Sequence, residues 1–141
     1  MIKNVFIPGI PIVKQRPRFS KNGHAYDPNA PQKEASLQKA KITGAEQIFR
    51  CALEVHFRFA FPRPKSHYGT GKNANILKAS APIYCTNEKD IDNLEKFYAD
   101  AFNCILWRDD AQIVKTQALK RWTGVDEVPH VLITVMTLED K

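Results

Sequence analysis

The sequence has little of what a disulfide scaffold, a zinc site or a membrane protein requires. It holds three cysteines, Cys51, Cys85 and Cys104, an odd number with no CxxC pair among them. Its four histidines are scattered along the chain. We therefore expect no disulfide framework and no structural zinc site, and free thiols that are mostly buried or inert. No apolar run approaches the ~20 residues that a membrane-spanning helix needs.

The N-terminal stretch MIKNVFIPGIPIV lacks the features of a secretory signal. It is apolar, but it has neither a long hydrophobic core nor a small-residue cleavage site, so a strand is expected there. We expect a soluble cytoplasmic protein that does not contact membranes. A chain of 141 residues, 43% of them hydrophobic, suits one domain over residues 1–141.

Acidic residues are scarce outside one short segment. Residues 1–87 hold 14 basic and 4 acidic residues, whereas residues 88–110 hold 3 basic and 7 acidic ones. The whole chain has a formal net charge of +6. A positive field around a small negative focus suits a protein that binds a polyanion and places metal ions against it.

The first half of the chain predicts a strand, a helix and a second strand. Residues 5–13 indicate an edge or irregular strand, because Pro8 and Pro11 interrupt it. Residues 14–28 are basic and rich in turn residues. An apolar stripe at spacings of three and four then predicts a helix through Leu37, Ala40, Gly44, Ala45 and Ile48. Residues 51–61 alternate cleanly, which is typical of a strand with one face in the core.

The second half begins with a long basic loop at about residues 62–89, which lacks a clear period. Apolar residues spaced by three and four predict a helix over residues 92–105, and strands are predicted over residues 112–122 and 131–138. The order β-α-β-loop-α-β-β indicates an α+β fold, with a mixed or antiparallel sheet and two main helices in a single domain.

The acidic residues of the second helix gather on its polar face. At ~100° per residue, Asp92, Lys96 and Asp100 share a face nearly opposite the apolar stripe. Asp90 lies two residues earlier, on the same side if the approach to the helix is extended. Asp109 and Asp110 precede the next strand, so one of them can join the group if that strand packs beside the helix.

Each of these carboxylates also has an ordinary structural explanation. Asp92 and Glu95 resemble a capping box, and Asp109-Asp110 resembles a turn. Capping, however, needs one aspartate, not three or more. Converging carboxylates repel unless a cation lies among them, and oxygen ligands favour Mg²⁺ or Mn²⁺. Lys96 could stabilise charge on a reacting phosphate, or could simply form a solvated pair with Asp92.

The segment KDIDNLEKFYADAFN, followed by WRDDAQ, resembles the signature of the RusA family of Holliday junction resolvases, small endodeoxyribonucleases often encoded by phages and prophages. PIVKQRPRF and FPRPKSHYGTGKN are similar to parts of its phage-type members. The resemblance implies metal-binding carboxylates at Asp90, Asp92 and Asp110, a catalytic lysine at Lys96, and supporting roles for Asp100 and Asp109. It also implies a homodimer that nicks four-way DNA junctions symmetrically. Unlike its relatives, the chain has no glycine turn in NCILW.

We therefore predict a structure-specific endodeoxyribonuclease that depends on Mg²⁺, with Mn²⁺ as a possible substitute. The predicted phosphate contacts are Lys14, Arg16, Arg18, Arg63, Lys65 and Lys72. Two alternatives stay open. One is a nuclease that acts on other branched DNA or on RNA. The other is a non-catalytic DNA-binding module whose acidic residues only cap a helix.

Overall fold

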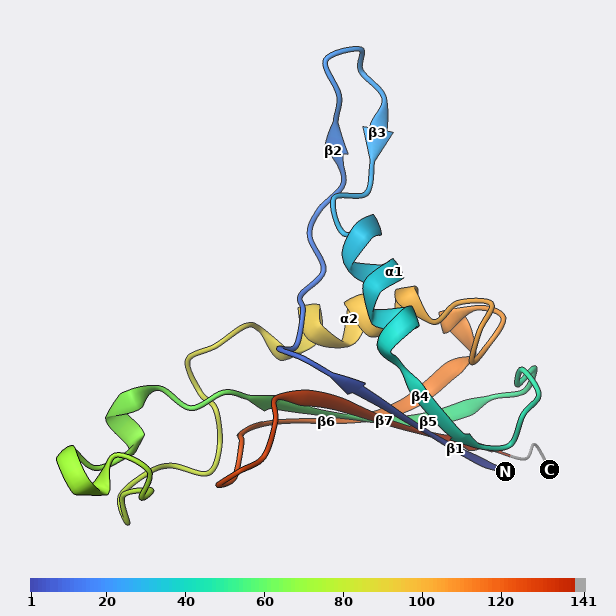
Figure 1. Ribbon diagram of the computed structural model, residues 1–141. Helices are drawn as coiled ribbons and strands as arrows, with labels where there is room; N and C mark the ends of the chain where they lie inside the picture. The colour runs from blue at the N-terminus through green and yellow to red at the C-terminus, as the bar shows by residue number, and fades with distance from the viewer. Residues whose placement is uncertain (139–141) are drawn as a thin grey trace.

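A computed structural model describes residues 1–138 and confirms the α+β architecture (Figure 1). The main sheet has five strands in the order β4-β1-β7-β5-β6, and both helices lie on one side of it. The strands are β1 (Ile2–Pro8), β4 (Lys41–Gly44), β5 (Leu53–Phe61), β6 (Ile113–Trp122) and β7 (His130–Thr137), and the helices are α1 (Ala30–Lys39) and α2 (Ile91–Ala101). Among residues 1–138, no helix is long and apolar enough to cross a membrane.

Strand β5 forms the centre of the sheet and confirms the alternation seen in the sequence. It pairs antiparallel with β7 and parallel with β6. Val55, Phe57 and Phe59 are at most 2% exposed and face the helices, whereas Arg58 is exposed on the other face. Its hydrophobic alternation therefore sets which face of the sheet carries the core.

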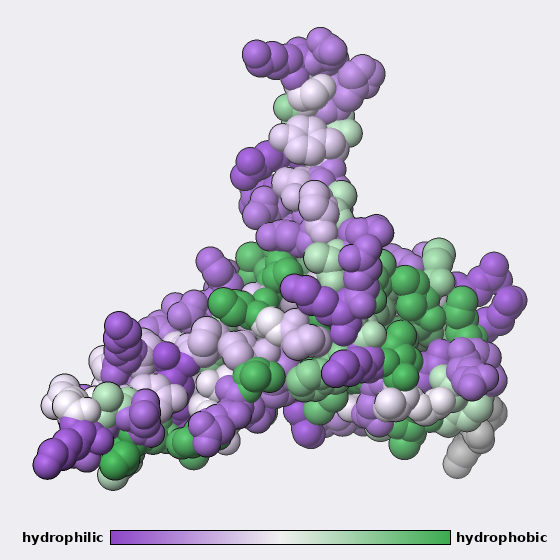
Figure 2. Space-filling model, viewed as in Figure 1, coloured by the Kyte–Doolittle hydropathy of each residue, from purple (hydrophilic) through white to green (hydrophobic). Residues whose placement is uncertain are grey.

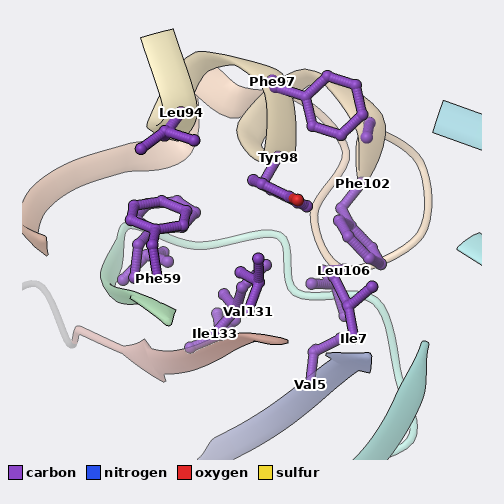
Figure 3. Close-up of a cluster of buried hydrophobic side chains, with 14 of the residues drawn as sticks. Val5, Ile7, Phe59, Leu94, Phe97, Tyr98, Phe102, Leu106, Val131 and Ile133 are labelled. Atoms are coloured by element: carbon purple, nitrogen blue, oxygen red, sulfur yellow. The ribbon is translucent and has the colours of Figure 1, made fainter. Parts of the chain in front are cut away.

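Helix α2 supplies the other half of that core. Leu94, Phe97, Tyr98 and Ala101 are at most 6% exposed and belong to the same hydrophobic core as the inner face of the sheet. Figure 3 shows Leu94 and Tyr98 lying over Phe59, Val131 and Ile133. The predicted apolar stripe is confirmed, but the helix ends at Ala101, four residues before the predicted end. Cys104 then adopts a left-handed conformation, with φ 67°, and makes the turn without a glycine.

The structure differs from the sequence prediction at the first strand. Strand β1 is an inner strand, because it pairs with both β4 and β7. Pro8 is its last residue and Pro11 lies beyond it, so neither proline interrupts the hydrogen-bond ladder. The expectation of an edge strand was therefore wrong.

The predicted first helix was also too long. It ends at Lys39, and Lys41–Gly44 forms the edge strand β4 instead. Ile42 and Thr43 are β-branched and pair with Val5 and Asn4 of β1. Without β4, one edge of β1 would carry unpaired backbone groups, so tertiary pairing overrides the helical spacing of the sequence.

Two segments extend away from the five-stranded sheet and its two helices (Figure 1). Residues 14–28 form an arm, whose hairpin pairs β2 (Arg18–Phe19) with β3 (Ala25–Tyr26). The long loop contains two 3₁₀ turns, Lys65–His67 and Gly71–Asn73. Its end lies along β6, where Cys85 donates a backbone hydrogen bond to Lys120. The three cysteines are free as predicted, but only Cys85 is buried.

We predict that Gly44→Ala destabilises the protein by about 2–4 kcal/mol. Gly44 has φ +104°, and an added Cβ would lie 2.3 Å from the carbonyl oxygen of Ile2. Gly9→Ala is the matched control, because Gly9 has φ +118° but open space around the added carbon. It should cost only about 1–2 kcal/mol. Urea unfolding followed by circular dichroism measures both, and equal losses would show that the close approach of β4 to β1 is unimportant.

Candidate functional site

Packing of α2 on the sheet leaves its polar face beside β6. Asp92 and Lys96 are exposed on this face. They line a cavity of about 240 Å³, whose wall also includes Asp110. The lining residues are Lys14, Phe57, Asp92, Glu95, Lys96, Ala99, Asp110, Ile113 and Thr116. Three of the four predicted catalytic residues therefore border one space.

A second hollow, of about 600 Å³, adjoins the first. It shares Lys14, Asp92 and Lys96 with the first cavity and continues along the root of the arm past Arg16. Lys96 Nζ lies 3.9 Å from Asp92 Oδ2, and both side chains are well exposed. The two hollows together place carboxylates, a lysine and the first basic residues of the arm around one groove.

Asp90 does not line either hollow. It is the N-cap residue of α2, with an extended backbone and an exposed side chain that makes no capping hydrogen bond. The helix thus begins before Asp92, and the capping box suggested for Asp92 and Glu95 is not formed. Lys120 Nζ donates to the carbonyl oxygen of Lys89 at 2.8 Å, which ties the approach to Asp90 onto β6.

Asp109 and Asp110 have different surroundings. Asp109 caps the short 3₁₀ turn Asp110–Gln112, where its side chain accepts a hydrogen bond from the Ala111 N–H at 2.9 Å. This bond lowers the pKa of Asp109. Burial, together with the adjacent Asp109, raises the pKa of Asp110. Asp109 therefore shapes the turn, and Asp110 is the carboxyl that borders the cavity.

Asp100 joins three elements near the groove. Its carboxylate pairs with Lys14 of the arm root, at 3.3 Å, and with Lys33 of α1. Lys33 also pairs with Asp27 at 2.5 Å. Burial alone would raise the pKa of Asp100, but hydrogen bonds from Lys33 and Lys14 outweigh it and the pKa is lowered. Asp100 thus holds Lys14 in place rather than lining the cavity.

Glu95 is a site residue that the sequence reasoning did not select. Its Oε1 atom is buried and has no hydrogen-bond partner among residues 1–138. Burial raises its pKa, and it lines the cavity together with Asp92 and Asp110. One feature of the sequence could have identified Glu95. It lies three residues after Asp92, which places it at the border between the polar face and the apolar stripe of the helix.

The predicted phosphate contacts are spread over two regions. Lys14 and Arg16 border the groove, and Arg18 lies on the hairpin of the arm. Arg63 is half-buried and donates to the carbonyl oxygens of Thr123, at 2.6 Å, and Pro82, at 2.7 Å. Lys65 and Lys72 are exposed on the long loop. Of the six predicted phosphate contacts, only Lys14, Arg16 and Arg18 therefore lie on the arm or beside the groove.

Within residues 1–138, no group of three or more histidine, cysteine, aspartate or glutamate side chains has a geometry that could hold a metal ion by itself. Asp92 and Asp110 share the cavity, while Asp90 stays outside it. The structure thus combines a small acidic site with neighbouring basic residues. This site lies at the foot of a basic arm on an α+β body.

Comparison with known protein families identifies the class of protein. The family described as Endodeoxyribonuclease RusA matches residues 8–136, and the chain belongs to this family. Membership implies an endodeoxyribonuclease that resolves Holliday junctions and binds junction DNA. A comparison with curated proteins found no match.

We predict that Glu95→Gln stabilises the metal-free protein in a pH-dependent way. Because burial raises the Glu95 pKa above 4.5, the native state retains a proton that the unfolded chain releases. The native state therefore binds more protons, and the stability of the parent falls as pH rises above 4.5. Glu95→Gln should gain about 1 kcal/mol at about pH 8 and much less at about pH 4.

Urea unfolding at both pH values measures this gain. Glu34→Gln, which changes an exposed glutamate of α1, is the control and should have no effect at either pH. An equal gain for Glu95→Gln at both pH values would mean that the buried charge is not its cause.

Proposed function

We propose that this protein resolves four-way DNA junctions by paired, symmetric nicks in a reaction that depends on Mg²⁺ or Mn²⁺. The observation that carries the proposal is the shared groove of Asp92, Lys96 and Asp110, with Lys14 and Arg16 at its rim. Negative groups that attract a cation thus lie beside positive groups that attract a phosphate. The packing of α2 and of the arm root sets the positions of both groups.

The donor groups fit a hard divalent cation. Mg²⁺ is usually held by one or two carboxylates, while water and substrate phosphates complete its shell. Asp92 and Asp110 would hold it, and the partnerless oxygen of Glu95 is a further donor at the same cavity. Asp90 would join from the N-cap position once DNA is present. When bound, the metal supplies Lewis acidity that activates water and offsets charge on the reacting phosphate.

Lys96 is suited to act on the phosphate itself. It lies one helical turn after Asp92, and its ammonium group is well exposed to the groove. A positive charge fixed beside the scissile phosphate stabilises the charge that develops on the phosphate oxygens in the transition state. Asp100 and Asp109 support this site indirectly, Asp100 through Lys14 and Asp109 through the turn that carries Asp110.

Symmetric cleavage requires two active sites. The described part of the chain forms a groove between α2 and β6. A four-way junction has two-fold symmetry. A homodimer with a two-fold axis would present one groove to each of two opposite strands. We therefore propose a homodimer that acts on junction DNA in the cytoplasm.

One observation favours a different function. The described residues form no closed group of three metal-ligating side chains, which is also what a non-catalytic DNA-binding module would show. Calorimetry with Mg²⁺ and with Mn²⁺, in the absence and presence of an uncut junction, separates the two functions. A module without catalytic activity would bind neither metal in the absence of DNA, and would add no metal binding to that of the junction alone. Comparison of a four-way junction with a flap and with an RNA junction defines the substrate class.

We predict that Asp92→Asn reduces junction cutting by at least about 100-fold while it leaves junction affinity nearly unchanged. The substitution removes a charged metal ligand but preserves shape, and Asp92 makes no contact on which folding depends. End-labelled junctions incubated with and without Mg²⁺ measure both nicks, and gel shifts in EDTA measure binding.

Asp126→Asn is the control for this loss. Asp126 is exposed in the turn between β6 and β7, and asparagine tolerates its positive φ of 60°. This variant should cut like the parent. If Asp92→Asn also cuts at the parent rate, the groove is not the catalytic site.

We predict that the double charge reversal Arg16→Glu/Arg18→Glu weakens junction binding by more than about 10-fold and lowers the salt slope by about 1.8. Each lost phosphate contact removes about 0.9 from the slope of log affinity against log salt concentration. Lys41→Glu/Arg50→Glu changes the net charge equally at exposed residues around β4 and should leave the slope unchanged. An equal slope in both variants would mean that only net charge matters.

A further inference from the structure

The arm has no core of its own and still presents large aromatic side chains. Phe19 is 71% exposed and Tyr26 is 48% exposed, and both lie in the two-stranded hairpin. The turn is closed by backbone bonds from Ser20 to His24, at 2.8 Å, and from Gly23 to Ser20, at 2.9 Å. Figure 1 shows the hairpin standing clear of the sheet and both helices. Neither ring contributes to the hydrophobic core.

The charge of the arm indicates which kind of partner it can bind. Residues 1–26 contain no aspartate or glutamate, and the arm carries Lys14, Arg16, Arg18 and Lys21. Figure 2 shows the arm as a narrow and mainly hydrophilic column above the body. Positive side chains interleaved with exposed aromatic rings match the two parts of a nucleic acid, which are its phosphates and its base faces.

The root of the arm is held firmly against the site. Asn29 is fully buried, accepts a hydrogen bond from the Gln15 N–H at 2.6 Å, and donates to the Val13 carbonyl at 3.3 Å. The Lys14 N–H donates to the carbonyl oxygen of Asn93 in α2, at 3.0 Å. These bonds join the arm to both helices, so the direction of the arm relative to the groove is set by the fold.

We infer that the arm places Phe19 and Tyr26 against unpaired bases next to the branch point of the junction, an inference that rests on the proposed function. Tyr26 pairs with Arg18, so Phe19, the next residue, projects from the opposite face of the ribbon. A ring on each face suits stacking between separated bases. A duplex groove exposes base edges and not base faces, whereas a branch point interrupts the stack and makes the faces accessible.

The test compares binding to a fixed four-way junction and to a linear duplex of the same sequence, in EDTA so that no cutting occurs. Phe19→Ala should weaken junction binding by about 5- to 100-fold and duplex binding by less than about 2-fold. Tyr26→Ala should act in the same direction, and Phe19→Trp should restore junction affinity. Val125→Ala, an exposed apolar residue between β6 and β7, is the matched control and should change neither.

A second readout uses 2-aminopurine, a fluorescent base analogue, placed beside the branch point. The parent should change its fluorescence on binding, and Phe19→Ala should lose most of that change. Equal weakening on junction and duplex would assign the arm to a duplex groove, and no weakening would show that the rings touch no DNA; either result overturns the inference. If the parent itself does not prefer the junction, the proposed function fails as well.

Discussion

Burial of one face of α2 against the sheet is the constraint on which the site depends. Leu94, Phe97, Tyr98 and Ala101 share one buried core with residues of β1, β5 and β7, and this burial fixes the rotation of the helix about its axis (Figure 3). The opposite face must then carry Asp92 and Lys96 toward solvent beside β6. Because closely packed cores tolerate little movement, the positions of Asp92 and Lys96 are set by the helix more than by their own weak, solvent-exposed attraction.

The same helix organises the positive groups. Tyr98 accepts a hydrogen bond from the Ile12 N–H at 3.0 Å, Asn93 accepts one from the Lys14 N–H, and Asp100 binds the ammonium group of Lys14. One element thus presents acidic residues to the cavity and also holds the root of the basic arm. In the proposed active site, this coupling would place groups that attract phosphate next to carboxylates that attract a cation.

The sequence predicted elements well where the apolar period was long and unambiguous. The alternation of residues 51–61 and the stripe of residues 92–105 marked β5 and α2 to within a few residues. It failed at residues 40–48, where spacings of three and four suggested more helix but pairing with β1 produced β4. It also missed Glu95, because an amphipathic pattern does not show which border residue is buried without a partner.

The sequence by itself determined the fold class, the polar face of α2 and the family to which the chain belongs, because these depend on local periodicity and on a contiguous motif. Only the tertiary structure decided which acidic residues share a space. Asp110 borders the cavity and Asp109 becomes a cap, although they are neighbours in the chain, because Asp109 precedes the 3₁₀ turn and Asp110 is its first residue. Distances between residues far apart in the chain depend on how strands pair, and no local pattern contains that information.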